Sequence, residues 1–531
     1  MGGSQSNLPP RPLGFEYMCI AVRPSDKLRV IYGTDYEISI IRQVIQETWL
    51  PGIQRETFML NGVHEFKLCG YPFAVNISSS NAALSRKMAS GILHRLNRDG
   101  WKLLVSSDLT RTSDLTTWIF MKVSVATLSS QPFMVVGLSS SDSLMVLNAP
   151  AELHQTFKDV LDKSWPRGIQ RWSYEDSVLL IKLKGTPWHP DGDETVHSRV
   201  VLQTLVNDLH ARQWSLYGNS NLKSGTNTFF FEHNPNVVQG QLPPAHFTIS
   251  LNKHDSLRLI GIPESLISAV RDVIQTSWRR GIQQESRYFD SWEFKLRGNP
   301  WWASGEEAVD SRYLVLKLME SMQAYGWMII ASIASSRKLS DKSALLFRQS
   351  QPRQAPVFCI SLNETDKLRL INAPEDVTKI CQDVIQAQYV IGIQRVQRYG
   401  SSLEFKLLGN PWGDGLTGYD GLHGRSLICH LFCALANHHW RPVTSADVSA
   451  KYVHQDKGPD YPIDVDSIFF TFDPTAAVQP AAPPPQVPYY QPYSQPFAPP
   501  PSYGFTSPPP SYGSTAPPSY EPPAYGAFST Q

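Results

Sequence analysis

Four short tetrads near the C-terminus contain the residues with the clearest binding chemistry in this 531-residue sequence. Each has two adjacent prolines, one small residue and a tyrosine, and all four fall within residues 500–525. The tetrads are Pro500-Pro501-Ser502-Tyr503, Pro509-Pro510-Ser511-Tyr512, Pro517-Pro518-Ser519-Tyr520 and Pro522-Pro523-Ala524-Tyr525. Adjacent prolines pre-form a polyproline II turn, and such turns dock on aromatic-lined grooves of partner proteins. We therefore predict that these tetrads bind a partner protein.

The tetrads resemble the PPxY ligands of WW domains. The resemblance implies WW-domain proteins as partners, and ubiquitin ligases of the WW-containing HECT class among them. In each tetrad the two prolines and the tyrosine would make the contacts. The alternative is a low-complexity tail that serves as a solvated spacer or self-associates through tyrosine.

The segment around the tetrads differs in composition from the rest of the chain. Residues 475–531 include 17 prolines and 7 tyrosines, no tryptophan, and Glu521 as the single charge. Such a segment cannot bury enough apolar surface to fold. The sequence therefore predicts a disordered tail over residues 474–531, with local polyproline II character.

The first six residues, Met-Gly-Gly-Ser-Gln-Ser, resemble the N-myristoylation pattern, with Gly2 as the acylated residue and Ser6 in the matching position. A single acyl chain binds membranes weakly and reversibly. The first 14 residues have one basic residue, Arg11, and no cysteine, so a second anchoring signal is absent nearby. We expect a cytoplasmic protein that associates reversibly with the cytoplasmic face of membranes.

An arginine recurs every 113 residues, at Arg86, Arg199, Arg312 and Arg425. Each lies near the start of a predicted helix, where the helix dipole disfavours a cation. Two interpretations remain open. The arginine forms a buried ion pair with an acid of its own module, or it joins free helix N–H groups in an anion-binding site.

Three other residue types recur, and for each the structural interpretation is favoured. The lysines are expected on a solvent-facing strand beside an acid, the glutamines at a turn, and the tryptophans in the core. These residues are Lys67, Lys182, Lys295 and Lys406; Gln54, Gln170, Gln283 and Gln394; and Trp101, Trp214, Trp327 and Trp440.

No catalytic set recurs, and we predict a protein that is not an enzyme and needs no cofactor or metal. Cys429 and Cys433 lie four residues apart on a predicted helix with His438 and His439 nearby, but the spacing fits buried thiols better than a metal site. Asp108 occupies the position that corresponds to Asp447 in the last repeat.

The recurring residues mark four copies of one module. The tripeptide Gly-Ile-Gln begins at Gly52, Gly168, Gly281 and Gly392, with intervals of 116, 113 and 111 residues. The domain organisation is therefore a flexible N-terminus over 1–14, modules over 15–126, 131–236, 245–350 and 356–473, and the tail. About 110 residues suffices for an independent domain, so four separately folded beads are expected.

Each module has the same predicted order of elements. An alternating segment such as 358–371 indicates a strand pair, and 374–386 has the apolar spacing of an amphipathic helix that begins after a proline. The Gly-Ile-Gln turn, one strand, a second helix and two last strands follow. The predicted fold is α+β, four tandem β-β-α-β-α-β-β modules with helices on an antiparallel sheet.

Composition narrows the class of protein. The chain has 48 Lys+Arg against 47 Asp+Glu, so no basic footprint for nucleic acid is present. The sequence has no apolar run of 18 residues, so we predict no transmembrane helix. The N-terminus has no apolar segment of the kind found in secretory signals, so we predict no secretory signal. The six cysteines are therefore expected as reduced thiols.

These observations predict a non-enzymatic intracellular adaptor. Its modules would form a rigid body with an unknown ligand, its acylated start would place it at membranes, and its tail would recruit WW-domain proteins. Two alternatives remain: a multivalent binder of anions or lipid headgroups through the repeated arginines, and an enzyme with a single active module.

Overall fold

The computed structural model describes residues 7–74, 78–110, 114–123, 130–175, 177–223, 226–237, 244–335, 342–413, 418–453 and 461–475. The chain divides into two units, Met1–Ala482 and Pro483–Gln531, and all described residues belong to the first.

The first two modules have six strands and two α-helices each. Module 1 consists of β1 (Tyr17–Arg23), β2 (Lys27–Ile31), α1 (Asp35–Thr48), β3 (Ile53–Phe58), β4 (Val63–Leu68), α2 (Ser79–Arg98), β5 (Trp101–Ser107) and β6 (Thr116–Lys122). Module 2 consists of β7 (Met134–Ser139), β8 (Ser143–Leu147), the 3₁₀ turn η1 (Ala151–Leu153), α3 (His154–Ser164), β9 (Ile169–Glu175), β10 (Val178–Leu183), α4 (Glu194–Ala211), β11 (Trp214–Lys223) and β12 (Thr226–His233).

The last two modules repeat this order with small additions. Module 3 consists of β13 (His246–Asn252), β14 (Ser256–Ile260), η2 (Glu264–Leu266), α5 (Ile267–Ser277), β15 (Ile282–Tyr288), β16 (Ser291–Leu296), η3 (Pro300–Trp302), α6 (Glu306–Ala324), β17 (Trp327–Ile333) and β18 (Ala344–Gln349). Module 4 consists of β19 (Val357–Asn363), β20 (Lys367–Ile371), α7 (Glu375–Gln388), β21 (Ile393–Tyr399), β22 (Ser402–Leu407), α8 (Asp420–Asn437), β23 (Trp440–Ala446), the short pair β24 (Tyr452–Val453) and β25 (Tyr461–Pro462), and β26 (Asp464–Phe472).

Each module forms one antiparallel six-stranded sheet with the same strand order. In module 1 the order is β3-β4-β2-β1-β6-β5, and the corresponding strands follow this order in the other three modules. The prediction of four tandem α+β modules is confirmed. The proline start of the first helix is also confirmed in module 4, where Pro374 is the N-cap of α7.

The module has one strand more than predicted, because the Gly-Ile-Gln segment opens a strand and is not only a turn. In module 1 this strand is β3, at the edge of the sheet. Gly52 has φ +79°, which favours glycine, and the ladder shifts register between Ile53 and Arg55, so Gln54 is the extra residue of a β-bulge. Edge strands are largely exposed and lack an apolar alternation, which explains why the sequence pattern did not indicate one.

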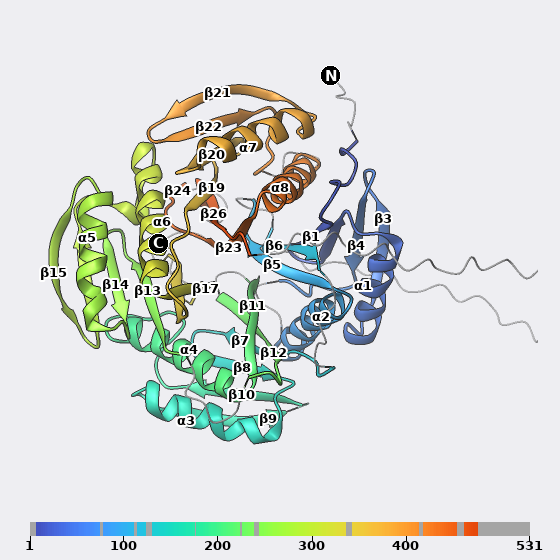
Figure 1. The fold of residues 1–531 in the computed structure, drawn as a ribbon. Helices are drawn as coiled ribbons and strands as arrows, with labels where there is room; N and C mark the ends of the chain where they lie inside the picture. Colours follow the sequence, from blue (N-terminus) through green and yellow to red (C-terminus); the bar gives the residue numbers. More distant parts are fainter. Residues whose placement is uncertain are drawn as a thin grey trace, which may run out of the picture. The chain divides into compact units, whose positions relative to one another are not determined.

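The two helices of a module have different partners. The first helix is amphipathic and packs on the second helix of its module. The second helix also contacts the first two strands of the next module, so that α2 lies on β7 and β8, α4 on β13 and β14, α6 on β19 and β20, and α8 on β1 and β2. In Figure 1 these second helices lie nearer to the middle of the four modules than the first helices. Module 4 thus closes the series on module 1.

The hydrophobic cores run across the module boundaries. The core of module 1 includes Phe133, Val135 and Phe230 of module 2. The core of module 4 includes Tyr17 and Ile119 of module 1. The expectation of four separately folded beads was therefore wrong, because a second helix that is apolar on two sides buries one of them in its neighbour.

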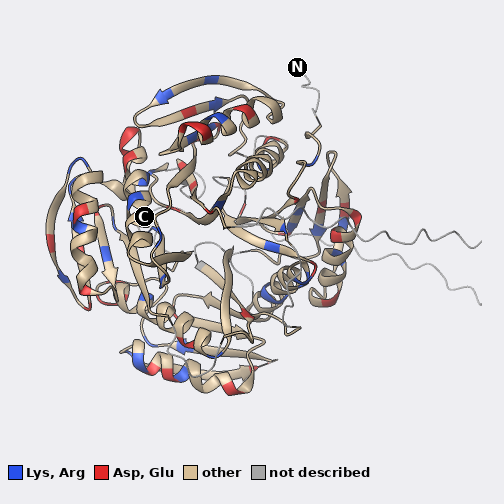
Figure 2. Ribbon diagram, in the orientation of Figure 1, with Lys and Arg blue, Asp and Glu red and all other residues tan. Residues whose placement is uncertain are grey.

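One strand from each module contributes to a cyclic set of contacts in the middle of the unit. Strands β5, β11, β17 and β23 contact one another in cyclic order (Figure 1). Basic and acidic residues are interspersed over all four modules, in keeping with the near-zero net charge (Figure 2).

Candidate functional site: the junctions between modules

The four repeated arginines lie at the junctions between modules, on the second helices. All four are buried, with exposed fractions of 3%, 2%, 1% and 4% in chain order. Neither interpretation from the sequence anticipated this location, because both placed the arginine within its own module. The reason is that the helix face bearing the arginine packs on the neighbouring sheet.

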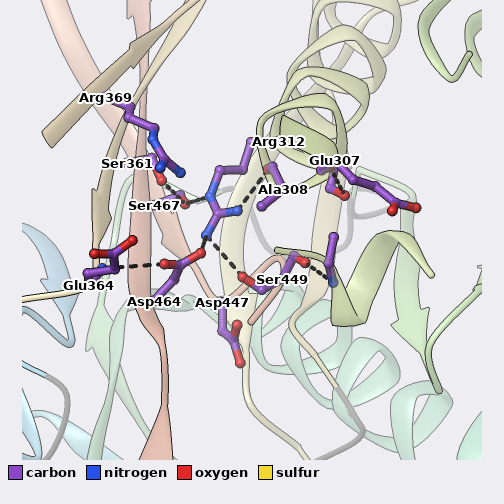
Figure 3. A network of polar contacts seen from close by, with 12 residues as sticks. Glu307, Ala308, Arg312, Ser361, Glu364, Arg369, Asp447, Ser449, Asp464 and Ser467 are labelled. Atoms are coloured by element: carbon purple, nitrogen blue, oxygen red, sulfur yellow. Dashed lines mark hydrogen bonds and ion pairs between the residues drawn. The ribbon is translucent and has the colours of Figure 1, made fainter. Parts of the chain in front are cut away.

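The junction between modules 3 and 4 shows the arrangement most fully (Figure 3). Arg312 donates from Nη1 to the carbonyl of Ala308 in its own helix, at 2.8 Å. Its Nε donates to Ser467 Oγ at 2.8 Å, and Nη2 donates to the carbonyl of Ser449 at 2.9 Å. Nη2 also lies 3.3 Å from Asp464 Oδ2. The guanidinium thus connects helix α6 to module 4 through hydrogen bonds and a buried ion pair.

The junction between modules 4 and 1 repeats these contacts and closes the cycle. Arg425 donates to the carbonyl of Gly421 at 2.7 Å and to Thr117 Oγ1 of module 1 at 3.2 Å. It also forms an ion pair with Asp114, whose other partner is Arg23 at 3.2 Å. Burial, reinforced by Arg23, lowers the pKa of Arg425 to about 9.

The two junctions of module 2 follow the same plan. Arg86 donates to Thr228 Oγ1 at 3.2 Å and to the carbonyl of Leu138 at 3.1 Å, both in module 2. Arg199 donates to the neighbouring Ser198 Oγ at 3.1 Å. The repeated arginines therefore act as clamps between modules, and the contacts described for Arg86, Arg312 and Arg425 direct their guanidinium groups at protein partners.

A second buried ion pair recurs in three of the modules. In modules 1, 3 and 4 an arginine of the second strand pairs with the glutamate opposite it on the fourth strand. These pairs are Arg29–Glu65 at 2.6 Å, Arg258–Glu293 at 2.6 Å and Arg369–Glu404 at 2.8 Å. Two of them reach the preceding module, because Arg29 donates to the carbonyl of Gly418 and Arg258 to Thr195 Oγ1. In module 2 the two positions are occupied by Met145 and Leu180.

A reciprocal hydrogen-bond pair joins the central strands at three seams. One residue donates its backbone N–H to the carbonyl of a residue in the next module. The side chain of the first residue accepts a hydrogen bond from the backbone N–H of that same second residue. The pairs are Asn227 with Ala334, Ser343 with Asp447, and Asp466 with Asp108. Sequence comparison aligned Asp108 with Asp447 but did not find their partners. The available signal was that corresponding positions on the last strands, Thr116, Asn227, Ser343 and Asp466, all have a side-chain acceptor.

The seam between modules 4 and 1 brings two carboxyl groups together. Asp466 Oδ2 accepts the N–H of Asp108 at 2.9 Å and the hydroxyl of Ser445 at 3.2 Å. Burial raises the pKa of Asp466 to about 7, and the nearby charge of Asp447 acts in the same direction. Burial, with Asp466 close by, also raises the pKa of Asp108. The seam therefore favours the protonated form of both carboxyl groups.

We predict that the contribution of Asp466 to the stability of the unit falls as pH rises. A carboxyl whose pKa is about 7 when folded and 3.8 ordinarily binds more protons in the folded state between these values, so the free energy of unfolding falls from about pH 4 to pH 7. Asp466→Asn keeps an oxygen for both donors and removes the titration. At pH 8 the variant should be more stable than the parent by on the order of 2 kcal/mol, and near pH 4 the difference should vanish. Urea unfolding at several pH values measures this, with the exposed Asp383→Asn as the unaffected control.

The repeated lysines and tryptophans lie where the sequence predicted, whereas the glutamines lie in the edge strand and not in a turn. Each lysine is partly exposed and faces an aspartate before the second strand, at 3.5–3.8 Å. Each tryptophan opens the strand after the second helix and is buried. Each glutamine is exposed and lies at a bulge of the edge strand.

The cysteines are all free thiols. Cys429 lies on α8 with its Sγ 3.1 Å from that of Cys19 in module 1, and Cys433 donates to the carbonyl of Leu13. These cysteines thus belong to the packing between module 4, the N-terminal segment and module 1. Among the described residues no group of three or more His, Cys, Asp or Glu side chains could hold a metal ion.

The expectation of a flexible N-terminus over residues 1–14 is wrong for the described part of that segment, because Leu8 is buried in the core and the carbonyl of Pro9 accepts a hydrogen bond from Tyr32.

The tetrads and Gly2 lie outside the described residues, so the WW-binding and lipidation predictions stand as predictions. In the part of the chain that the structure describes, no helix is long and apolar enough to cross a membrane.

Comparison with known protein families assigns the chain to one domain family. The profile of one domain family matches it four times, over residues 16–121, 132–233, 245–348 and 356–471. The chain therefore belongs to this family, a repeated domain to which no function is assigned. No curated protein matches the chain.

Proposed function

We propose that the protein is a non-enzymatic adaptor that recruits WW-domain proteins through its four tetrads. The observation that carries this proposal is the occurrence of four Pro-Pro-x-Tyr tetrads within 26 residues. One such tetrad in a proline-rich segment is weak support, but four tetrads with tyrosine in every copy match the sequence pattern of WW-domain ligands. We propose ubiquitin ligases of the HECT class, which have several WW domains, as its partners.

The folded unit supports the role of a platform. Its modules share their cores and close on one another, so it offers a partner a fixed surface. An anion-binding role for the repeated arginines receives no support from these contacts, because the guanidinium groups are buried at the junctions.

Proximity labelling in cells tests the proposal directly. The intact protein should label WW-containing HECT ligases, and a variant lacking residues 474–531 should not. Equal labelling of these ligases by the intact protein and by the variant would show that the tail does not recruit them.

Gly2 gives a separate prediction about membranes. We propose that the glycine carries a myristoyl group, which at an association constant of about 10⁴ M⁻¹ holds only part of the protein on membranes. Gly2→Ala should abolish both the incorporation of a myristate analogue and the membrane-bound fraction. Gly3→Ala leaves the acylated residue in place and should keep both. An intact protein that incorporates no analogue would exclude the modification.

A further inference from the structure

A cavity of about 310 Å³ lies at the junction between modules 1 and 2. Helix α2 contributes Leu84 to its lining, and the sheet of module 2 contributes Met145, Leu147 and Leu180. Leu50, which follows α1, is 80% exposed at the cavity. The walls are therefore mainly apolar, and they come from both modules.

The cavity coincides with the place where module 2 departs from the other three. Met145 and Leu180 are directly opposite each other on β8 and β10. The corresponding pair in the other modules is the buried arginine and glutamate described above. Replacing a long ion pair by two shorter apolar side chains removes both the volume and the charge that occupy this place elsewhere.

The lining indicates the chemistry of an occupant. Leu84 and Leu180 are partly exposed and give the lining an apolar surface, whereas Met145 and Leu147 are buried. Lys87 on α2 is an exposed cation in the lining. Among the described lining residues the acid is Glu175, and it pairs with Arg171 at 3.1 Å. An alkyl chain with a single negative head group matches both parts, because its tail is buried while its head stays in water beside the lysine.

We propose that this cavity binds a free medium-chain fatty acid, with the alkyl tail against Leu84 and Leu180 and the carboxylate beside Lys87. The proposal is independent of the adaptor function, because it rests on the folded unit alone.

Calorimetry with octanoate and decanoate below their micelle concentrations tests the proposal. The full chain with Gly2→Ala is used, so that no acyl group of its own competes. We expect one saturable site, and an affinity that rises about fourfold for each added CH₂ group until the cavity is filled. Lys87→Glu should weaken decanoate binding several-fold and leave decanol binding unchanged.

The decisive variant restores the pattern of the other modules. Met145→Arg with Leu180→Glu should fold, since three modules already hold this pair, and should weaken decanoate binding at least tenfold. Ala83→Leu, which narrows the cavity from the α2 side, should weaken it as well, and Leu408→Glu in module 4 is the matched control without effect. Circular dichroism and thermal unfolding confirm that the variants are folded.

Three results would overturn the proposal. The first is the absence of saturable binding to the parent chain. The second is equal affinity for the parent and for the folded Met145→Arg, Leu180→Glu variant. The third is decanoate binding that disappears when Gly2 is acylated, which would assign the cavity to the chain's own acyl group.

Discussion

Replacing Arg425 with alanine is expected to lower the free energy of unfolding of the four-module unit by about 3–5 kcal/mol. The guanidinium is 4% exposed and forms an ion pair with Asp114, whose side chain is 1% exposed. Its loss leaves that carboxylate buried with Arg23 as its remaining ion-pair partner. Because this junction closes module 4 on module 1, the cost should appear as a lower urea midpoint for the whole unit.

Two further variants distinguish the stability lost by breaking this buried ion pair from the stability that any substitution could cost. The double change Arg425→Met and Asp114→Leu replaces the pair with apolar groups and should recover most of the lost stability. Lys379→Ala breaks an exposed pair with Asp383 on α7 and should cost less than about 0.5 kcal/mol. An Arg425→Ala variant as stable as Lys379→Ala would contradict the role of the arginine as a clamp.

The repeat allowed much of the fold to be predicted from the sequence. Positions such as Trp101 and Arg86 recur with a fixed interval, and a fixed interval requires equivalent places in equivalent modules. The edge strand β3 was missed because its exposed residues have no apolar alternation. Local pattern therefore identifies buried elements far better than exposed ones.

The junctions could not be predicted, because no local pattern states which module a helix will contact. Arg312 was singled out by its register, but its partner Asp464 lies 152 residues further along the chain. For Asp466 and Asp108 the separation is 358 residues, across the closure of the cycle. One clue was available, since the second helices have apolar residues on more than one face.

The second large effect concerns the tail. A partner with two linked WW domains is expected to bind about 10²–10⁴-fold more tightly than a single WW domain, because the second contact is intramolecular. The tyrosines are 9, 8 and 5 residues apart. At about 3.1 Å per residue in polyproline II, the first two gaps span roughly 25–28 Å and the last roughly 15 Å. The first two gaps suit separate WW domains, and the last is too short for two.

This spacing orders the expected effects of single changes. Tyr525→Ala should cost little while Tyr520 remains, because those two tetrads compete for one domain. Phosphorylation of a tyrosine should weaken its tetrad, since a dianion does not fit an apolar pocket. A large loss from Tyr525→Ala alone would contradict the spacing argument.

The most direct test of the adaptor proposal is calorimetry of the full chain with a tandem-WW fragment. The chain is compared with a variant in which Tyr503, Tyr512, Tyr520 and Tyr525 are all alanine, a change that leaves every described residue untouched. The proposal predicts tight binding by the parent chain and no measurable binding by the variant. Equal affinity for the two proteins would contradict it.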